Sequence, residues 1–251
     1  MRFDVITLFP ELFAPFLSTG INRKAFEGGL VEVHLHNPRD FAPGNYRRVD
    51  DRPFGGGPGM VMLAQPLTDC LAHIRTQRAQ AQPCPVVLFS PLGQTLKHEG
   101  VQTWAKSEGA VLICGRYEGL DQRFIDAHVD VQLSLGDFVL SGGEVAAMAL
   151  LDAVARLQPG VLNDEDSHHQ DSFNPALDGL LDCPHYTRPE VWEGQAVPEV
   201  LLSGHHERIE AWRRAQRLQL TARLRPDLIA QAREAGRLSP ADERCLASPS
   251  P

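Results

Sequence analysis

The sequence lacks the long apolar runs and the paired cysteines that mark several classes of protein. No run of about 18 consecutive apolar residues occurs, so no helix is expected to cross a membrane. The five cysteines are odd in number and show no CxxC spacing. This argues against a disulfide framework or a zinc ribbon and favours reduced thiols in the cytoplasm. The N-terminal segment carries Asp4 and Glu11 in its apolar part, which predicts a first strand rather than a signal peptide.

Two phosphate-binding signatures are also missing. No G-x-G-x-x-G pattern follows a predicted strand, so a dinucleotide-binding Rossmann unit is not supported. The glycine-rich run 55–59 lacks the Gly-Lys-Ser/Thr ending of a P-loop, which argues against a nucleoside-triphosphate site. This run closes a loop over 37–60 that is rich in proline, glycine and charge. A loop of such length within a domain is usually functional or disordered.

Positive charge is scarce overall but is concentrated near the C-terminus. The formal net charge of −8 disfavours a nucleic-acid partner if the charge is spread evenly. However, eight arginines and only four acidic residues lie between Leu201 and Arg237. Two interpretations stay open, a phosphate-facing surface and an ordinary solvated helix face, and charge alone favours the second.

Apolar segments of strand length alternate with segments of helical periodicity as far as about Gly160. This alternation predicts an α/β fold with a largely parallel sheet. Ser-Gly-Gly-Glu at 141–144 has the pattern of a capping box, so a helix is expected to start there and run to about Arg156. The predicted strands are 3–8, 31–35, 85–89, 111–114 and 127–135. The predicted helices are 9–16, 22–26, 65–79, 96–107, 141–156, 201–224 and 226–237, the last two beyond a polar linker.

Three glycine-bearing loops follow predicted strands, at 90–94, 115–119 and 135–143. The carboxyl ends of strands in an α/β sheet are where such folds usually bind ligands. Glycines there let the backbone approach a ligand closely. A tight turn is the simpler explanation for any one of these loops, but three at successive strand ends favour one shared pocket.

Five motifs occur in a fixed order along the chain: YRRVDDRPFGGGPGM, LICGRYEGLDQR, SLGDFVLSGGE, DSF and GLLDCPHYTRPEVWEG. Together they resemble the bacterial tRNA (guanine-N1-)-methyltransferase family of the SPOUT class, and the match runs from the first strand to about Arg225. The resemblance implies transfer of a methyl group from S-adenosylmethionine to N1 of the guanine immediately 3′ of the anticodon in tRNA.

The resemblance also implies an architecture and an assembly. It implies a parallel-sheet SPOUT methyltransferase domain over 1–162 with a deep trefoil knot, a linker over 163–176, and a small helical tRNA-binding domain over 177–251. The enzyme is expected to be a cytoplasmic homodimer with its active site at the subunit interface. Asp171 of one subunit is expected opposite the pocket of the other. The tail 247–251 is expected to be disordered.

The resemblance places the methyl-donor pocket in the three glycine-bearing loops. Leu135, Phe138 and Leu140 are expected to supply apolar walls, and Glu118 to face the sulfonium charge or bond polar groups. The predicted cofactor-binding residues are Ser90, Pro91, Gly115, Tyr117, Glu118, Gly119, Leu135, Gly136, Asp137, Phe138, Val139, Leu140, Gly142 and Gly143.

Two catalytic residues follow from the resemblance, Asp171 as general base and Arg156 as its electrostatic partner. Guanine N1 accepts a methyl group only if its proton leaves, which requires a positioned base. Negative charge then builds on guanine O6, and a fixed guanidinium stabilises it. Without the resemblance, the two residues would be interpreted as a linker aspartate and an arginine that complements a helix dipole.

Asp50, His185 and Arg188 are expected to contact RNA, with Tyr186 beside them, and Asp51 is an alternative to its neighbour Asp50. Loop aromatics and arginines often bind RNA by stacking and phosphate contact. His168 and His169 are adjacent, and this spacing makes a poor chelate, so no protein metal site is predicted. The resemblance implies magnesium-dependent activity without indicating a ligand set.

Two departures from the family pattern and two competing functions remain. The segment 174–178 looks longer than usual, and Phe138 stands where a tyrosine is expected, which loses a hydroxyl but keeps an apolar wall.

One competing function is another SPOUT methyltransferase that modifies ribose or a different base. The other is a non-catalytic RNA-binding protein that uses the arginine-rich helices. The pairing of Asp171 with Arg156 argues against ribose chemistry, which has no ring proton to remove.

Overall fold

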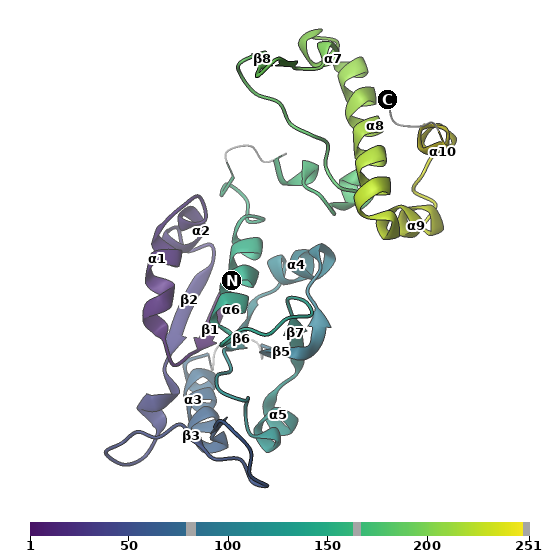
Figure 1. The fold of residues 1–251 in the computed structure, drawn as a ribbon. Helices are drawn as coiled ribbons and strands as arrows, with labels where there is room; N and C mark the ends of the chain where they lie inside the picture. The colour runs from purple at the N-terminus through teal and green to yellow at the C-terminus, as the bar shows by residue number, and fades with distance from the viewer. Residues whose placement is uncertain (79–83, 163–166, 248–251) are drawn as a thin grey trace. The chain divides into compact units, whose positions relative to one another are not determined.

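The structure, a computed structural model, describes residues 1–78, 84–162 and 167–247 (Figure 1). The chain forms two compact units, Met1–Asn163 and Asp164–Pro251. Part of the predicted linker, at 163–166, and the predicted disordered tail from residue 248 lie outside the described residues.

The first unit is built on a five-stranded parallel sheet. Its strands stand in the order β2-β1-β6-β5-β7, and each neighbouring pair runs parallel. This confirms the predicted α/β class. The strands are β1 Arg2–Ile6, β2 Glu32–His36, β5 Val86–Thr95, β6 Gly109–Ile113 and β7 Val131–Ser134. Two further short strands, β3 Asp50–Asp51 and β4 Val61–Met62, pair antiparallel outside this sheet.

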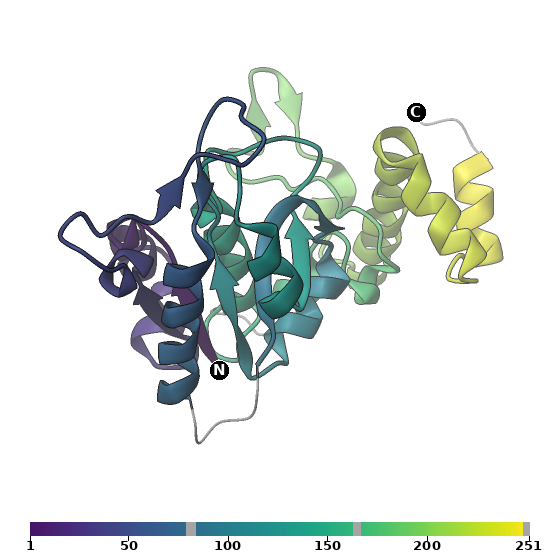
Figure 2. The ribbon, with the colours of Figure 1, turned by 90° about the horizontal axis from the view of Figure 1, so that it is seen from below.

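Helices cover both faces of this sheet (Figure 2). The central strand β6 is buried along its whole length, and its alternate residues supply two separate cores. Ala110 and Leu112 belong to one core with the apolar side of α6, and Val111 and Ile113 belong to the other with α3 and α5. This division follows from the two-residue period of a strand. The helices are α1 Phe13–Ser18, α2 Arg23–Glu27, α3 Ala64–Gln77, α4 His98–Ala105, α5 Gln122–His128 and α6 Glu144–Ala155.

The strand predicted over 127–135 is wrong in its first half. Helix α5 continues to His128, and β7 covers only Val131–Ser134. The Asp121 carboxylate caps the start of α5 by accepting a hydrogen bond from the Arg123 amide at 2.9 Å. The Val129 amide still donates to the Ile125 carbonyl within the helix, and the Asp130 amide donates to the Val86 carbonyl of β5 at 2.9 Å, so pairing with the sheet begins only after His128. The period of a short apolar run does not distinguish the end of a helix from the start of a strand.

The capping box predicted at 141–144 does not form. Helix α6 begins at Glu144, with Gly143 at its N-cap and no side-chain hydrogen bond to the cap. The Glu144 carboxylate instead faces the core, where it contacts Thr7 and Arg116. The Glu144 carboxylate, which the capping box would require, is therefore engaged in an ion pair with Arg116 instead.

Two predicted helices are broken into shorter pieces. The helix predicted over 201–224 consists of α7 Glu199–Leu202 and α8 His206–Leu224. Gly204 lies between them with a φ of +68°, a left-handed conformation that favours glycine and ends α7. The helix predicted over 9–16 is a 3₁₀ turn at Pro10–Leu12 followed by α1.

The second unit is helical around a small apolar core. It contains α7, α8, α9 Pro226–Glu234, α10 Pro240–Ala247 and a short hairpin of β8 Val191–Trp192 and β9 Gln195–Ala196. The core is formed by Leu180, Leu218, Ile229 and Ala232.

The described part of the predicted linker is ordered within this second unit. Residues Ser167–Gln170 and Pro175–Leu177 form 3₁₀ turns. The Phe173 amide donates a hydrogen bond to the Leu180 carbonyl at 2.9 Å. Asn174 is buried and caps the second of these turns by accepting from the Ala176 amide.

Most of the arginines that give 201–237 its positive charge are paired with carboxylates of the same unit. Arg214 contacts both Asp178 and Asp242, and Arg217 contacts Asp182. Further pairs are Arg213 with Glu210, Arg225 with Asp227 and Arg233 with Glu243. Several of these carboxylates lie outside the arginine-rich stretch itself, so the local excess in the sequence is offset in the fold.

The Arg214–Asp242 pair predicts a pH-dependent stability for the second unit. The bidentate hydrogen bonds from Arg214, at 2.9 and 3.0 Å, lower the pKa of the buried Asp242 from 3.8 to about 2. A lowered folded-state pKa stabilises the fold above the unfolded pKa, and this contribution is lost as the pH falls toward the folded value. Asp242→Asn should therefore lower the free energy of unfolding by about 2 kcal/mol at pH 7, and the difference from wild type should shrink toward pH 2.

Urea unfolding followed by tryptophan fluorescence at several pH values measures this difference. Asp227→Asn is the matched control, because Asp227 pairs with Arg225 at the surface and both side chains are well exposed. A destabilisation by Asp242→Asn that is the same at pH 7 and pH 3 would contradict the assignment.

Candidate functional site

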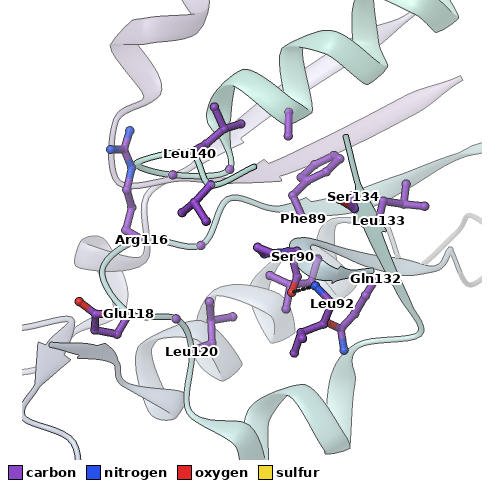
Figure 3. Close-up of a pocket in the computed structure, with 18 of the residues that line it drawn as sticks. Phe89, Ser90, Leu92, Arg116, Glu118, Leu120, Gln132, Leu133, Ser134 and Leu140 are labelled. Carbon is purple, nitrogen blue, oxygen red and sulfur yellow. Dashed lines mark hydrogen bonds between the residues drawn. The ribbon is translucent and has the colours of Figure 1, made fainter. Parts of the chain in front are cut away.

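A pocket of about 400 Å³ in the first unit lies beside residues 88–92 of β5 and the loops that follow β6 and β7 (Figure 3). The loop predicted at 90–94 is part of β5, where the pairing with β7 is interrupted between Phe89 and Gln94. Figure 3 shows Arg116 and Glu118 on one side of it and Ser90, Leu92 and Gln132 on the other. All three strands run parallel, so their carboxyl ends meet at one edge of the sheet. This is the edge at which α/β folds usually bind ligands.

The loops around the pocket touch one another so closely that glycine is required at particular positions. The Gly143 amide donates a hydrogen bond to the Gly115 carbonyl at 3.0 Å. A Cβ atom at Gly143 would lie 2.7 Å from the Cα of Cys114, and one at Gly93 would lie 2.5 Å from backbone atoms of Gln132 and Leu133. Backbone cannot move aside as a flexible side chain can, so these glycines set the spacing of the loops.

Twelve of the fourteen residues predicted to bind the methyl donor line this pocket. They are Ser90, Pro91, Gly115, Tyr117, Glu118, Gly119, Leu135, Phe138, Val139, Leu140, Gly142 and Gly143. Gly136 and Asp137 lie in the same loop but are not among the lining residues. Gly136 has a φ of +151° and turns the chain between Leu135 and Phe138.

Sequence reasoning missed several lining residues. Some belong to the strands themselves and point into the pocket just before the loops begin. Gln132 and Ser134 near the end of β7 are polar, and their place near a strand end was an available signal. Leu92, Arg116 and Ser141 lie within the three segments assigned to the pocket but were not named individually. The residues missed altogether are Leu88, Phe89, Leu120, Gln122, Ile125, Gln132, Leu133, Ser134 and Ala146.

A buried ion pair connects the walls of the pocket. Arg116 Nη2 lies 2.8 Å from Glu144 Oε2, and the Glu144 side chain is 1% exposed. Glu144 Oε1 accepts a hydrogen bond from Thr7 Oγ1 at 2.8 Å. Arg116 Nη1 also donates to the Ser141 carbonyl at 3.2 Å, and its guanidinium lies 4.4 Å from the centre of the Phe9 ring. One side chain therefore ties together the ends of β1 and β6 and the loop before α6.

The long N-terminal loop is fastened to the same pocket. The Glu118 amide donates to the Met60 carbonyl at 3.0 Å, and the Met62 amide donates to the Gly119 carbonyl at 2.9 Å. The Glu118 side chain covers Gly59, where a Cβ atom would lie 2.4 Å from Oε1. Residues 59–62 thus support the loop that carries Glu118.

The one cysteine beside the pocket is chemically inert. Burial raises the pKa of the Cys114 thiol well above its ordinary value, and the nearby Glu144 carboxylate raises it further. A neutral, fully buried thiol is not a nucleophile at neutral pH. Any group transfer in this pocket therefore proceeds without a cysteine intermediate.

The remaining predicted site residues are not among the residues that line the pocket. Arg156 is the half-buried C-cap residue of α6, in the first unit, and Asp171 is half-buried in the second unit. Asp50 is half-buried in β3, where it pairs with Met62. In the second unit, His185 is exposed and its Nε2 lies 2.9 Å from the Asp182 carboxylate, and Arg188 is exposed.

Metal and membrane features were sought among the described residues. Within 1–78, 84–162 and 167–247, no three His, Cys, Asp or Glu side chains are grouped so as to hold a metal ion. The side chain of His168 lies outside the described part of the chain. The helices of the described ranges include none with the length and apolar character needed to cross a membrane.

Comparison with known proteins agrees with the motifs. The family model described as tRNA (guanine-1)-methyltransferase TrmD matches residues 1–231. The chain belongs to this family. It is 75% identical over 248 residues to a tRNA (guanine-N(1)-)-methyltransferase of Albidiferax ferrireducens, covering 99% of each chain. It is 59% identical over 250 residues to the protein so named in Bordetella pertussis, covering 99% of this chain and 97% of that one.

Membership of the tRNA (guanine-1)-methyltransferase family decides between the functional classes that the sequence left open. The chain is an enzyme that methylates tRNA, rather than a non-catalytic RNA-binding protein. The pocket at the edge of the sheet is thus the candidate active site of a methyltransferase.

The ion pair beside the pocket predicts a strong coupling between Arg116 and Glu144. Removing one partner of a buried pair leaves the other charge without compensation and typically costs about 3–5 kcal/mol. We expect Arg116→Met and Glu144→Gln each to destabilise the protein strongly. The double variant should be markedly more stable than the sum of the two effects predicts, because neither charge is then left alone.

Denaturant unfolding of the four proteins in this cycle measures the coupling. Arg123→Met is the control, because Arg123 is 81% exposed and pairs with Asp121 outside this network. Additive effects of the two substitutions would show that the pair does not hold the loops together.

Proposed function

We propose that the chain transfers a methyl group from S-adenosylmethionine to N1 of the guanine immediately 3′ of the anticodon in tRNA. The pocket carries this proposal, because three glycine-bearing segments meet there: the interrupted part of β5 and the loops that follow β6 and β7. Its volume of about 400 Å³ lies within the usual range for small-molecule sites. Family membership supports the choice of guanine N1 as the acceptor.

The lining residues fit an adenosine-containing methyl donor. Leu135, Phe138 and Leu140 offer apolar surface for a purine, and the glycines leave backbone N–H and C=O groups accessible to its polar edge. S-adenosylmethionine supplies a methyl group on a positively charged sulfur. Glu118 is the acidic side chain of the lining and would face that charge. In this proposal, Gly136 and Asp137 shape the loop around the donor.

Asp171 and Arg156 would perform the proton chemistry on guanine. Asp171 removes the N1 proton, so that the N1 lone pair is free to attack the methyl carbon. Arg156 stabilises the negative charge that develops on O6 as this proton leaves. No nucleophile of the protein is required, which agrees with the inert state of Cys114.

We further propose a homodimer in which Asp171 of one subunit faces the pocket of the other. Apolar side chains around the pocket are widely exposed in the single chain, and patches of this kind mark interaction surfaces. Leu92 is 88% exposed and Val139 is 83% exposed. Tyr117, Phe138 and Val145 are also exposed around the same loops. A second copy of the chain would cover this surface and shield the pocket from water.

The proposed fold includes the deep trefoil knot over the C-terminal half of the first unit. The close contacts of 139–143 with the 114–116 segment support it, since Gly143 packs on Cys114 and Gly142 pairs with Arg116. Asp50, His185 and Arg188 would contact the RNA. The second unit would serve as the tRNA-binding domain, and the enzyme would act in the cytoplasm, where its substrate is found.

Replacing Asp171 tests its role as the base. Asp171→Asn should lower kcat by about 10²- to 10⁴-fold, the usual contribution of a general base, while calorimetry shows unchanged donor affinity. Asp227→Asn, an exposed aspartate of the same unit, is the control and should keep full activity. Transfer by Asp171→Asn at the wild-type rate to a tRNA transcript with guanine beside the anticodon would exclude Asp171 as the base.

Mixing two inactive variants tests the shared active site. Asp171→Asn removes the base, and Gly143→Ala distorts the pocket because its Cβ atom would lie 2.7 Å from the Cα of Cys114 and push the two loops apart. A dimer with one chain of each kind contains one intact site if Asp171 acts across the interface. We therefore expect the mixture, after exchange of subunits, to recover activity that neither variant has alone. No recovery from a mixture shown to contain the mixed dimer would place Asp171 and the pocket in the same chain.

A further inference from the structure

Two aromatic side chains project into solvent from the segment 43–59, which we call the aromatic arm. Phe54 is fully exposed and Tyr46 is 95% exposed. Single exposed apolar residues are ordinary on a protein surface. Two exposed aromatic rings on one segment are unusual, because each ring forgoes the hydrophobic stabilisation that burial would give.

The backbone of the arm leaves both faces of these rings open. Gly44, Gly55, Gly56 and Gly57 all have positive φ, which turns the chain sharply without side chains. A Cβ atom at any of these four glycines would meet no atom within 4 Å. A flat ligand therefore has room to approach the ring of Phe54.

The base of the arm is firmly held, so that the rings have a defined place relative to the pocket. Val49 is buried, and its carbonyl accepts a hydrogen bond from the Leu63 amide at 2.8 Å. Strands β3 and β4 pair on either side of the glycine run. The Glu118 amide bonds to Met60, which joins the arm to the pocket loop. The arm thus belongs to the same rigid surroundings as the proposed donor site.

Three arginines lie between the two aromatic residues of the arm. Arg47, Arg48 and Arg52 are all exposed. Arg47 contacts Asp40 at 3.1 Å and Arg48 contacts Asp51 at 2.9 Å, with every side chain of these pairs more than half exposed. Exposed pairs of this kind contribute little free energy, so a phosphate group can replace the carboxylate at small cost.

This combination fits unpaired RNA better than another protein. Unpaired bases are recognised by stacking on aromatic rings, and neighbouring phosphates are bound by arginine. A protein interface needs a continuous apolar area around its aromatic anchors. The neighbours of Phe54 are instead arginine, proline and glycine, which offer little apolar surface.

We infer that the aromatic arm binds the unpaired loop of the tRNA, with Phe54 and Tyr46 stacking on bases and Arg52 contacting phosphate. This inference rests on the proposed function and adds to it a stacking surface separate from the methyl-donor pocket. Asp50 lies at the base of the arm, so stacking at its tip would hold the RNA while the target guanine enters the pocket.

Substitutions at Phe54 distinguish stacking from other contacts. Phe54→Ala and Phe54→Leu should each raise the Kd for a tRNA transcript, and the KM in methyl transfer, by about five- to 100-fold. Phe54→Trp should stay close to wild type because it keeps an aromatic face. Donor affinity by calorimetry and kcat at saturating tRNA should not change. Arg52→Gln should reduce the slope of log K against log salt by about 0.7, the loss of one phosphate contact to a single strand.

Leu30→Ala is the matched control, since Leu30 is 41% exposed in the turn before β2, at the opposite edge of the sheet. The stacking role would be overturned if Phe54→Ala, or Phe54→Leu alone, bound tRNA with wild-type affinity. It would also be overturned if Leu30→Ala lost as much tRNA affinity as Phe54→Ala. A change of oligomeric mass in Phe54→Ala by sedimentation would make the arm a protein interface instead. If the wild type binds tRNA through the arm but transfers no methyl group, the proposed methyl transfer is wrong and the RNA-binding role of the arm is still supported.

Discussion

The buried contact between Arg116 and Glu144 is the interaction on which the pocket depends. Glu144 is the first residue of α6 and is almost wholly removed from solvent, so its charge needs a partner. Arg116 supplies that partner from the loop after β6, and Thr7 supplies a hydrogen bond from the end of β1. Three segments that are distant in sequence therefore meet at one carboxylate. Two of the segments that line the pocket, the loop after β6 and the loop before α6, adjoin this carboxylate, so the ion pair fixes their spacing.

Glycine complements this ion pair by letting the loops approach. Gly142 lies against the Arg116 side chain, where a Cβ atom would lie 2.2 Å from Nε, and Gly143 lies against the backbone of Cys114. A larger residue at Gly143 would separate the loop of 135–143 from the ends of β5 and β6. The pocket thus has walls of backbone and apolar side chains with few charged groups. Such an environment strengthens the electrostatic effect of the charges that remain, Glu118 among them.

The two units differ in ways that fit the proposed division of methyl-donor binding and tRNA binding between them. A methyl-donor pocket needs a rigid scaffold, and the parallel sheet provides one because both of its faces are buried under helices. A large, charged RNA needs surfaces that are exposed and polar. The protein has a formal net charge of −8, and most arginines of the second unit are paired with carboxylates. The surface of that unit is therefore not uniformly basic. Recognition by local features such as the aromatic arm, rather than by net charge, fits this distribution.

Local sequence patterns were enough to predict the α/β class, the parallel sheet and most of the stretches that line the pocket. These follow from strand-length apolar runs and from glycines at their ends, which are local patterns. Two local patterns misled: the capping box at 141–144, and the apolar run at 127–135. Long-range contacts explain both differences. Glu144 pairs with Arg116 instead of capping its own helix, and the segment after α5 bonds to β5 only from Asp130, whose amide donates to the Val86 carbonyl. The exposure of Phe54 and Tyr46 also required the fold, since no sequence pattern tells a buried aromatic ring from one left uncovered.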